Sequence, residues 1–238
     1  GVAQQVEFKV IATIKNTSIE NQVSNVVGMT VTPYEVVIVY PHLNLPGSYD
    51  PYGDNGSWDG DGNDYTRIYS LKSDDRYEGY VNMVAGGNAA NAVEFKFTKV
   101  NWGDGEFSYS GTPGKLISGG GGNIPLTSGG YYKVNADINS LSYSVTKITR
   151  WGIVGGATGD GSWSSDLAMN YDEAANKWTL TTNLVAGEFK FRANGGWDIN
   201  YGDDKADGKL DAGGANIAIS AAGNYTITLD LVGPVYKY

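Results

Sequence analysis

Cysteine is absent from this 238-residue chain, and histidine occurs once, as His42. The lack of cysteine excludes disulfides, thiolate zinc sites and thiol nucleophiles. No serine or threonine stands in a recognisable nucleophile elbow, so a Ser-His-Asp arrangement around His42 has little support. Glycoside hydrolysis needs a pair of carboxylates, and nothing singles out one pair among the 26 acidic residues. We therefore do not expect an enzyme.

Basic residues and long apolar runs are also scarce. The chain has 17 Lys and Arg against 26 Asp and Glu, which gives a formal net charge of −9. An acidic chain repels phosphate backbones, so nucleic acid is not an expected partner. No apolar run approaches the roughly twenty residues that a membrane-spanning helix needs.

Glycine and tyrosine are abundant, with 34 and 17 residues. This composition favours short strands, tight turns and many aromatic side chains over a helical fold. The length allows one large domain or two ordinary ones.

The C-terminal part of the chain repeats its middle. Residues 120–145 align with residues 213–238 without a gap, and upstream Glu94–Phe97 and Glu188–Phe191 both read Glu-Phe-Lys-Phe. The tryptophans that correspond between the copies are Trp102 with Trp197 and Trp58 with Trp163. Two copies of one domain explain this pattern most simply.

Each copy alternates apolar and polar residues with the period of a strand that faces a core. The apolar positions are Tyr132, Val134, Ala136 and Ile138 in the first copy and Tyr225, Ile227, Leu229 and Leu231 in the second. Clusters of turn residues separate the runs, which predicts an all-β protein of tandem antiparallel β-sandwiches, Ig-like or carbohydrate-binding-module-like. The predicted domains are residues 34–148 and 149–238, preceded by strands of a partial Ig-like domain in residues 1–33.

The strongest local signal is the strand at residues 188–194 and the glycine-rich loop after it. Alternation sends Phe189 and Phe191 inward, so we expect Lys190 and Arg192 to face outward. The loop then presents Trp197, Asp198, Asn200 and Tyr201. A flat ring beside cations and amides suits a sugar, because the ring packs on C–H groups and the polar groups bond hydroxyls. Alternatively, the two rings cover the open end of the sandwich and the charges are merely solvated.

Four other tryptophans divide by their surroundings. Trp163 and Trp58 lie in loops rich in Gly, Asp and Ser, where they either plug a sheet edge or offer a binding platform, and we favour the platform. Trp151 and Trp178 lie in apolar alternation and are predicted to be core residues. In the first copy, Lys96 and Trp102 echo the candidate site of the second.

Two further motifs are weak. Asp59–Asn63 places oxygen ligands at the first, third and fifth positions of a calcium loop, but the sixth is Asp64 and the twelfth is Ser70. A solvated acidic loop is favoured, and no metal is predicted. The glycine-rich run Gly152–Gly159 is followed by neither a helix nor a Lys-Ser/Thr pair, so no nucleotide cofactor is predicted.

Three segments, which follow one another in the order that the family has, resemble parts of SusE/SusF-type outer-membrane starch-binding lipoproteins. Ile148–Thr158, followed by Gly161-Ser-Trp163, is similar to the opening of their starch-binding domains. Phe189–Gly202 resembles their central strand and loop, also seen in accessory domains of pullulanase-like enzymes, and Ser24–Tyr34 resembles the closing strand of their N-terminal Ig-like domain. The resemblance covers about the last ninety residues well and the middle region loosely.

This resemblance implies a protein on the outer surface of a Bacteroidetes-type outer membrane, held there by a lipid anchor. Such proteins retain polysaccharide near a SusC/SusD-like uptake complex and carry out no catalysis. The implied binding residues are Trp163, Lys190, Arg192 and Trp197, with Lys96 and Trp102 in the first copy. That copy departs from the pattern, because Thr98 follows Phe97 where the second copy has an arginine. The lipid-bearing cysteine of the family is absent, so we expect the chain to be trimmed at its start.

The sequence therefore predicts non-catalytic binding of a polysaccharide at the cell surface, either a starch-like α-glucan or another neutral glycan. The alternative is a structural or adhesion module whose aromatic residues only pack. The identity and linkage of the glycan, and whether one or both copies bind it, are left open by the sequence.

Overall fold

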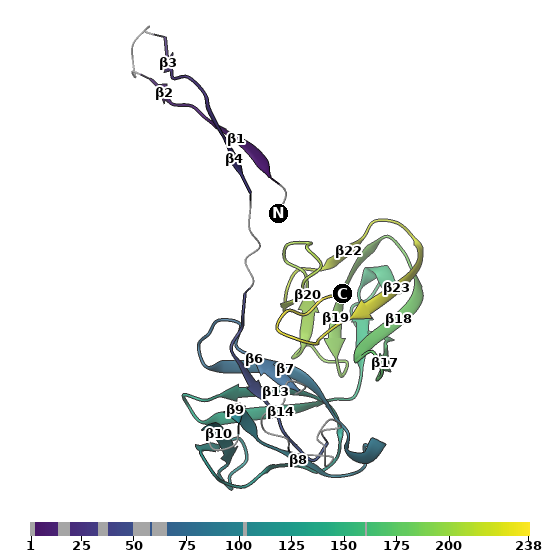
Figure 1. The fold of residues 1–238 in the computed structure, drawn as a ribbon. Coiled ribbons are helices and arrows are strands. Elements are labelled where there is room, and N and C mark those ends of the chain that lie inside the picture. Colours follow the sequence, from purple (N-terminus) through teal and green to yellow (C-terminus); the bar gives the residue numbers. More distant parts are fainter. Residues whose placement is uncertain are drawn as a thin grey trace. The chain divides into compact units, whose positions relative to one another are not determined.

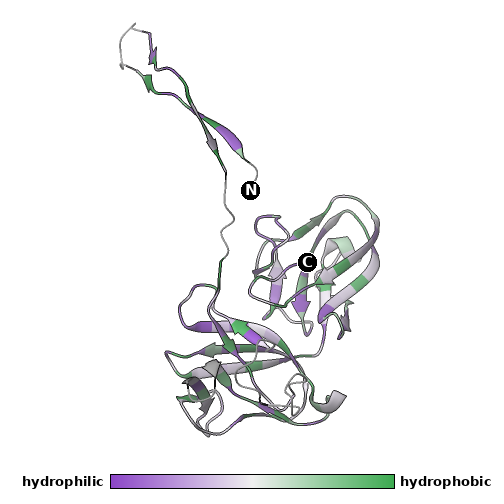
Figure 2. Cartoon of the chain, viewed as in Figure 1, coloured by the Kyte–Doolittle hydropathy of each residue, from purple (hydrophilic) through white to green (hydrophobic). Residues whose placement is uncertain are grey.

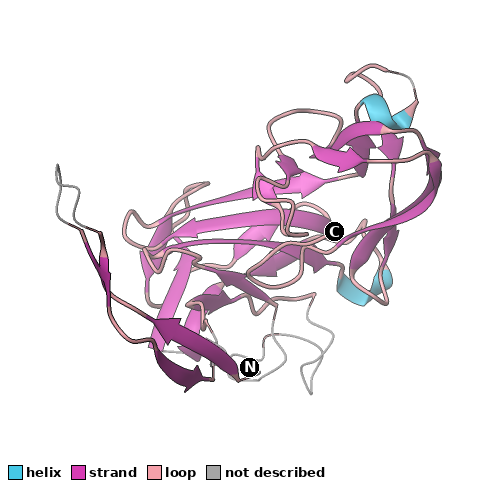
Figure 3. Cartoon of the chain, turned by 90° about the horizontal axis from the view of Figure 1, so that it is seen from above, coloured by secondary structure: helices cyan, strands magenta, loops and turns pink. Residues whose placement is uncertain are grey.

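The structure, a computed structural model, describes residues 3–13, 20–32, 38–49, 58, 66–101, 104–159 and 161–238. In these residues the regular structure is almost entirely β, and every strand pairing is antiparallel (Figure 3). The helical segments among them are two single 3-10 turns, η1 (Ala85–Gly87) and η2 (Gly156–Thr158). The predicted all-β sandwich class is confirmed. The chain divides into two compact units, Gly1–Val39 and Tyr40–Tyr238.

The N-terminal unit contains a β-ribbon. Its strands are β1 (Gln4–Phe8), β2 (Ile11–Ala12), β3 (Gln22–Val23) and β4 (Val27–Val31). β1 pairs with β4 so that Val6 lies opposite Met29 and Phe8 opposite Val27, which places apolar side chains on one face. Hydrophobic and hydrophilic residues follow one another along these strands (Figure 2). The apolar face is exposed, with Phe8 at 55%.

The second unit begins with a sandwich, most of whose strands are labelled in Figure 1. Its main sheet has the strand order β11-β10-β9-β5-β6-β7-β13-β14, and β12 and β8 form a separate pair. Its strands are β5 (His42–Asn44), β6 (Arg67–Tyr69), β7 (Arg76–Met83), β8 (Val93–Phe95), β9 (Phe97–Asn101), β10 (Asp104–Tyr109), β11 (Leu116–Ser118), β12 (Ile124–Leu126), β13 (Gly130–Asp137) and β14 (Ser142–Ile148). The side chains of the long central strands alternate between a buried and a less buried face, as the period-two pattern predicts.

A second sandwich follows. One sheet has the order β16-β15-β19-β20-β21, with β22 also paired to β19, and the other has the order β17-β18-β23. The strands are β15 (Trp151–Val154), β16 (Leu167–Ala168), β17 (Asn170–Asp172), β18 (Lys177–Leu184), β19 (Gly187–Ala193), β20 (Asn200–Gly202), β21 (Asp211–Ala212), β22 (Ile217–Ile219) and β23 (Gly223–Leu229). The predicted boundary near Thr149 falls in the short link between β14 and β15, and Pro33 lies outside the described residues.

The two sandwiches repeat each other in detail at the Glu-Phe-Lys-Phe motif. Phe95 and Phe97 are both fully buried, with ring centroids 5.3 Å apart and planes at 88°. Phe189 and Phe191 adopt the same arrangement, at 5.4 Å and 81°. The same edge-to-face aromatic pair therefore forms part of the core in each copy.

Matching hydrogen bonds also recur at aligned positions. The amide of Asn123 donates to the carboxylate of Glu94 at 2.5 Å, and the amide of Asn216 donates to Glu188 at 2.8 Å. Tyr132 and Tyr225 each donate a hydroxyl hydrogen bond to the carbonyl of the residue four positions earlier, at 2.6 and 2.8 Å. The sequence repeat is thus a repeat of local structure.

A cluster of tyrosines joins the two sandwiches. Tyr80 on β7 lies 3.0 Å, hydroxyl to hydroxyl, from Tyr201 on β20, and its ring meets the ring of Trp151 edge-on at 5.8 Å between centroids. Tyr236 packs against both tyrosines, at 5.4 and 5.6 Å. Because these rings are buried, the apolar core of the second sandwich extends into the first.

Candidate functional site

The face of the second sandwich that carries the candidate site is set by the alternation of β19. Phe189 and Phe191 are 1% and 0% exposed, which confirms that they point into the core. Lys190 and Arg192 lie on the opposite face, where Lys190 is opposite Val154 of β15. Arg192 lies between Gly152 of β15 and Asn200 of β20.

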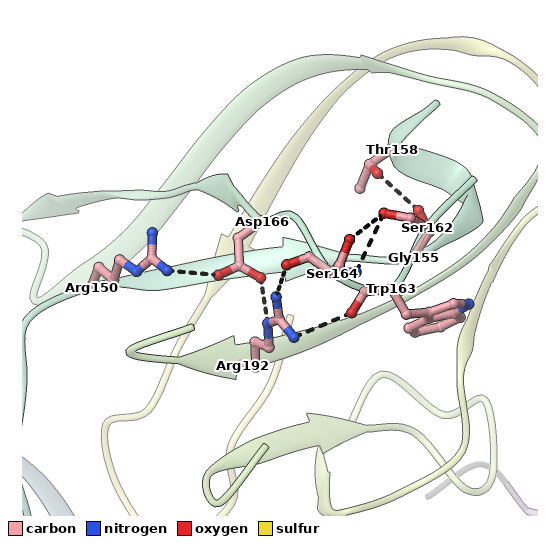
Figure 4. Close-up of polar contacts among 8 residues, drawn as sticks. All are labelled: Arg150, Gly155, Thr158, Ser162, Trp163, Ser164, Asp166 and Arg192. Carbon is pink, nitrogen blue, oxygen red and sulfur yellow. Dashed lines mark hydrogen bonds and ion pairs between the residues drawn. The ribbon is translucent and has the colours of Figure 1, made fainter. Parts of the chain in front are cut away.

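The expectation that Arg192 is exposed at the surface is wrong, because its side chain is covered. The residue is only 4% exposed. Its Nε donates to a carboxylate oxygen of Asp166, its Nη2 to the carbonyl of Ser164 at 2.7 Å, and its Nη1 to the carbonyl of Trp163 at 3.3 Å (Figure 4). The segment 162–166 therefore folds over this face of the sheet, and Arg192 holds it there.

Asp166 is the second centre of this network. Its side chain is 2% exposed and also pairs with Nη2 of Arg150 at 3.2 Å (Figure 4). Gly152 makes room for it, since a β-carbon at that position would lie 2.7 Å from Cβ of Asp166. A buried carboxylate between two guanidinium groups is compensated, whereas loss of the carboxylate would leave the buried charge of Arg192 without a counter-charge.

Two tryptophans stand side by side above the network. Trp163 and Trp197 are 36% and 45% exposed, and their ring centroids are 6.2 Å apart with planes tilted by 39°. The guanidinium carbon of Arg192 lies 4.8 Å from the centroid of the Trp197 ring, within cation–π range. The same arginine bonds the backbone of Trp163, so both indoles are positioned by one side chain. We call Trp163 and Trp197 the indole platform.

Gly155 fixes how the indole of Trp163 packs. Its φ of +146° is a conformation that L side chains rarely adopt, and a β-carbon there would lie 2.3 Å from the carbonyl oxygen of Glu188 and 3.0 Å from Cη2 of Trp163. The indole therefore packs closely over this glycine.

Three polar residues come from β19, which carries Arg192, and from the segment that carries Trp197. Nζ of Lys190 donates to the carbonyl of Gly213 at 3.1 Å, and burial lowers its pKa while the charge of Asp204 opposes that effect. Asn200 donates from Nδ2 to the carbonyl of Trp197 at 2.7 Å, and among the described residues its buried Oδ1 finds no partner. Asp198 is exposed beside Trp197.

The expectation that Tyr201 is a binding residue is wrong, because Tyr201 is a core residue. It lies opposite Phe191 in the sheet register, so it points to the inner face, and it is 2% exposed. Burial raises the pKa of its hydroxyl, which contacts Tyr80. A ring packed between the two sandwiches has no free face for a ligand. Trp151 and Trp178, by contrast, are confirmed as core residues at 0% and 6%.

The first copy forms a different arrangement. Nζ of Lys96 lies 2.5 Å from Glu106, both side chains are nearly buried, and Ser108 donates to the same carboxylate at 2.9 Å. The Lys96 hydrogen bond lowers the pKa of Glu106. Trp102 and the Asp59–Asn63 loop lie outside the described residues, and Trp58 is half-buried with a φ of +69°. Lys96 is thus an internal ion-pair partner.

Sequence reasoning missed the residues that hold the platform, namely Arg150, Ser164, Asp166 and Gly213. The signal that pointed to them is indirect. Gly152 lies on the buried strand β15 and Gly155 directly follows it. Glycines at such positions indicate that another segment approaches the backbone closely.

The described ranges contain no helix long and apolar enough to span a membrane. Nor do they bring together three or more acidic or histidine side chains in a way that would hold a metal ion.

Comparison with known proteins gives a distant likeness to a solved structure. No family model and no curated protein matches the sequence. Among solved structures, the chain is similar to SusF from Bacteroides thetaiotaomicron, with 17% identity and a TM-score of 0.34 over 99% of this chain. The match spans 57% of that SusF chain, so this chain corresponds to little more than half of its length. A likeness at this level assigns neither family nor function.

Proposed function

We propose that this protein binds polysaccharide without cutting it and that the indole platform is its contact surface. The observation that carries the proposal is the pair of exposed, mutually tilted indoles of Trp163 and Trp197. Two adjacent aromatic faces suit the apolar faces of successive sugar rings. Their tilt suits a curved chain better than a flat one.

The polar groups beside the platform support the same class of ligand. Lys190 offers further ammonium hydrogens to hydroxyls. Arg192 contributes through the position of Trp197, because its guanidinium is already bonded to Asp166 and to backbone carbonyls.

The same contacts argue against hydrolysis at this surface. Asp166 is paired with two arginines, and Glu188 accepts a hydrogen bond from Asn216. A glycosidase needs one carboxyl group that keeps a proton near neutral pH and a second that acts from across the bond. The exposed Asp198, beside Trp197, is not placed opposite a second carboxyl group by any contact of the described residues.

The finer parts of the proposal rest on the sequence resemblance. They are a starch-like α-glucan or another neutral glycan as ligand, a lipid-anchored position on the outer face of an outer membrane, and cooperation with a SusC/SusD-like uptake complex. A surface that stacks one or two sugar rings has an expected affinity of ~µM to mM, or about 4 to 8 kcal/mol.

Affinity electrophoresis through gels that contain starch, xylan, mannan or β-glucan tests the proposal, together with an assay for released sugars. We expect retardation by at least one polysaccharide without sugar release, and its loss in Trp163→Ala and Trp197→Ala. Phe8→Ala, which removes an exposed ring from the N-terminal unit, is the matched control. Retention that survives both platform substitutions would show that the surface is wrongly assigned. No retention by any gel would favour a structural module.

A further inference from the structure

A groove with a volume of about 390 Å³ lies between the two sandwiches, beside the tyrosine cluster that joins them. Tyr80 and Val81 of β7 form part of its floor. Arg67 and Tyr69 of β6 line it from the first sandwich, and Tyr171 and Glu173 line it from the second. Ligand sites in proteins are commonly clefts of about 300–1,000 Å³ at such junctions.

Two of the tyrosines that line the groove, Tyr69 and Tyr171, are held in place by their neighbours. Tyr171 packs on Tyr131 and Trp178, each with 5.1 Å between ring centroids, and its hydroxyl donates to Oδ1 of Asn176 at 2.7 Å. Tyr69 packs against His42, with 6.1 Å between centroids. Both tyrosines stay partly exposed. The groove therefore offers half-exposed aromatic rings whose positions are fixed before any ligand arrives.

Polar groups converge on the same groove from both sandwiches. Arg67 uses Nε to bond Oδ1 of Asn44 at 3.2 Å, and within the described residues no carboxylate lies at ion-pair distance from it. Its remaining guanidinium hydrogens are donors for a ligand. Asn82 donates to Glu173 across the junction at 3.4 Å, and Glu173 is exposed with acceptor capacity to spare.

The charges select the class of ligand. Arg67 would repel a cationic ligand and Glu173 an anionic one, so a neutral molecule rich in hydroxyl groups fits best. Arginine, asparagine and glutamate together can bond adjacent hydroxyls as donors and acceptors, while a tyrosine ring packs on the C–H face of a sugar.

We propose that this groove is a second saccharide-binding site, built jointly by the two sandwiches and separate from the indole platform. The proposal rests on the proposed function in one respect, since the expected ligand is a neutral glycan of the same class. Two sites on one chain would raise the retention of a polymer through effective concentration, without any new contact at either site.

Amide chemical shifts of the isotope-labelled full chain locate binding directly. The probes are maltoheptaose, cellohexaose, xylohexaose and mannohexaose, each titrated into the wild type and into the Trp163→Ala/Trp197→Ala double variant. We expect at least one probe to shift amides near residues 67–69, 82 and 171–176, and to do so equally in the double variant. Both indoles lie at the surface and are partly exposed, so we expect that variant to keep its fold, which its amide spectrum shows directly.

The groove variants are Arg67→Ala and Glu173→Ala, and Arg76→Ala is the matched control, because Arg76 is an exposed arginine of the same sandwich. The groove variants should lose the groove shifts, with an apparent Kd raised at least tenfold, and keep the platform shifts. Shifts confined to the platform would overturn the groove and leave the proposed function standing. Shifts confined to the groove would support the groove as a binding site and would overturn the indole platform as the contact surface. If no probe shifts either region, both proposals fail.

Discussion

The guanidinium carbon of Arg192 lies 4.8 Å from the ring centroid of Trp197, while Nη1 of the same arginine bonds the backbone carbonyl of Trp163. One buried side chain therefore positions both exposed indoles. Because Asp166 supplies its counter-charge, the geometry of the platform depends on an ion pair that no ligand would touch.

Asp166→Ala tests this dependence. The substitution leaves Arg192 buried and unpaired, which costs roughly 3–5 kcal/mol when a buried pair is broken on one side. We expect urea denaturation to show a loss of this order and affinity gels to show weaker glycan retention, although both tryptophans remain. Arg150→Ala is the control, because its side chain is 52% exposed and such pairs are worth about 1 kcal/mol or less. Unchanged retention in Asp166→Ala would refute the coupling.

Lys190 and Lys96 occupy equivalent positions in the repeat, yet we expect opposite outcomes from their substitution. Lys96 pairs with Glu106 inside the first sandwich, whereas Lys190 bonds the carbonyl of Gly213 beside the platform. Lys190→Ala should weaken glycan binding about three- to tenfold with little change in melting temperature, as expected for loss of one hydrogen bond worth about 1 kcal/mol. Lys96→Ala should lower the melting temperature and leave binding at the platform unchanged. Titration calorimetry and thermal melts separate the two.

Tyr201→Phe tests the reassignment of Tyr201 from ligand contact to core. Removing the hydroxyl deprives Tyr80 of a partner 3.0 Å away, at an expected cost of about 1 kcal/mol. Glycan affinity should stay at the wild-type value. A loss of binding without a loss of stability would return Tyr201 to the binding surface.

Alkaline unfolding is expected from the tyrosine cluster. Burial raises the pKa values of Tyr80, Tyr131, Tyr201 and Tyr236 above the ordinary value near 10. Above that pH the unfolded chain loses these protons while the folded chain keeps them, so stability is full below about pH 10 and falls as the pH rises. Each such group contributes up to ~1.4 kcal/mol per pH unit.

Urea denaturation at a series of alkaline pH values measures this slope. Exposed tyrosines ionise near pH 10 in the folded chain, so the cluster accounts for the part of the tyrosinate absorbance that should rise only with unfolding. Tyr201→Phe removes one of the groups and should give a shallower slope. A cluster that ionises while the fold stays intact would contradict the assignment.

The alternation of apolar and polar residues predicts the all-β fold and the face of β19 on which each side chain lies. A period of two residues predicts that Phe189 and Phe191 point into the core and that Lys190 and Arg192 lie on the other face, and the structure confirms both placements. The same rule sends Tyr201 inward with Phe191 once Asn200–Gly202 is known to be a strand, but the glycine-rich sequence around it is typical of a loop.

The burial of Arg192 could not be predicted from the sequence. Its partner Asp166 is 26 residues away, and a strand face is exposed only if no other segment crosses it. The ion pair of Lys96 could not be predicted for the same reason. The Glu-Phe-Lys-Phe motif is identical in both copies, and the partner Glu106 lies outside the motif. Periodicity gives the face of a sheet on which a side chain lies, whereas the fold decides what covers that face.

The indole resonances of Trp163 and Trp197 test the central claim most directly. In a titration of the full chain with a polysaccharide that retards it, the side-chain N–H signals of these two tryptophans should shift and saturate together. Those of the buried Trp151 and Trp178 should stay in place. Saturable glycan binding that leaves both platform signals unmoved would contradict the account.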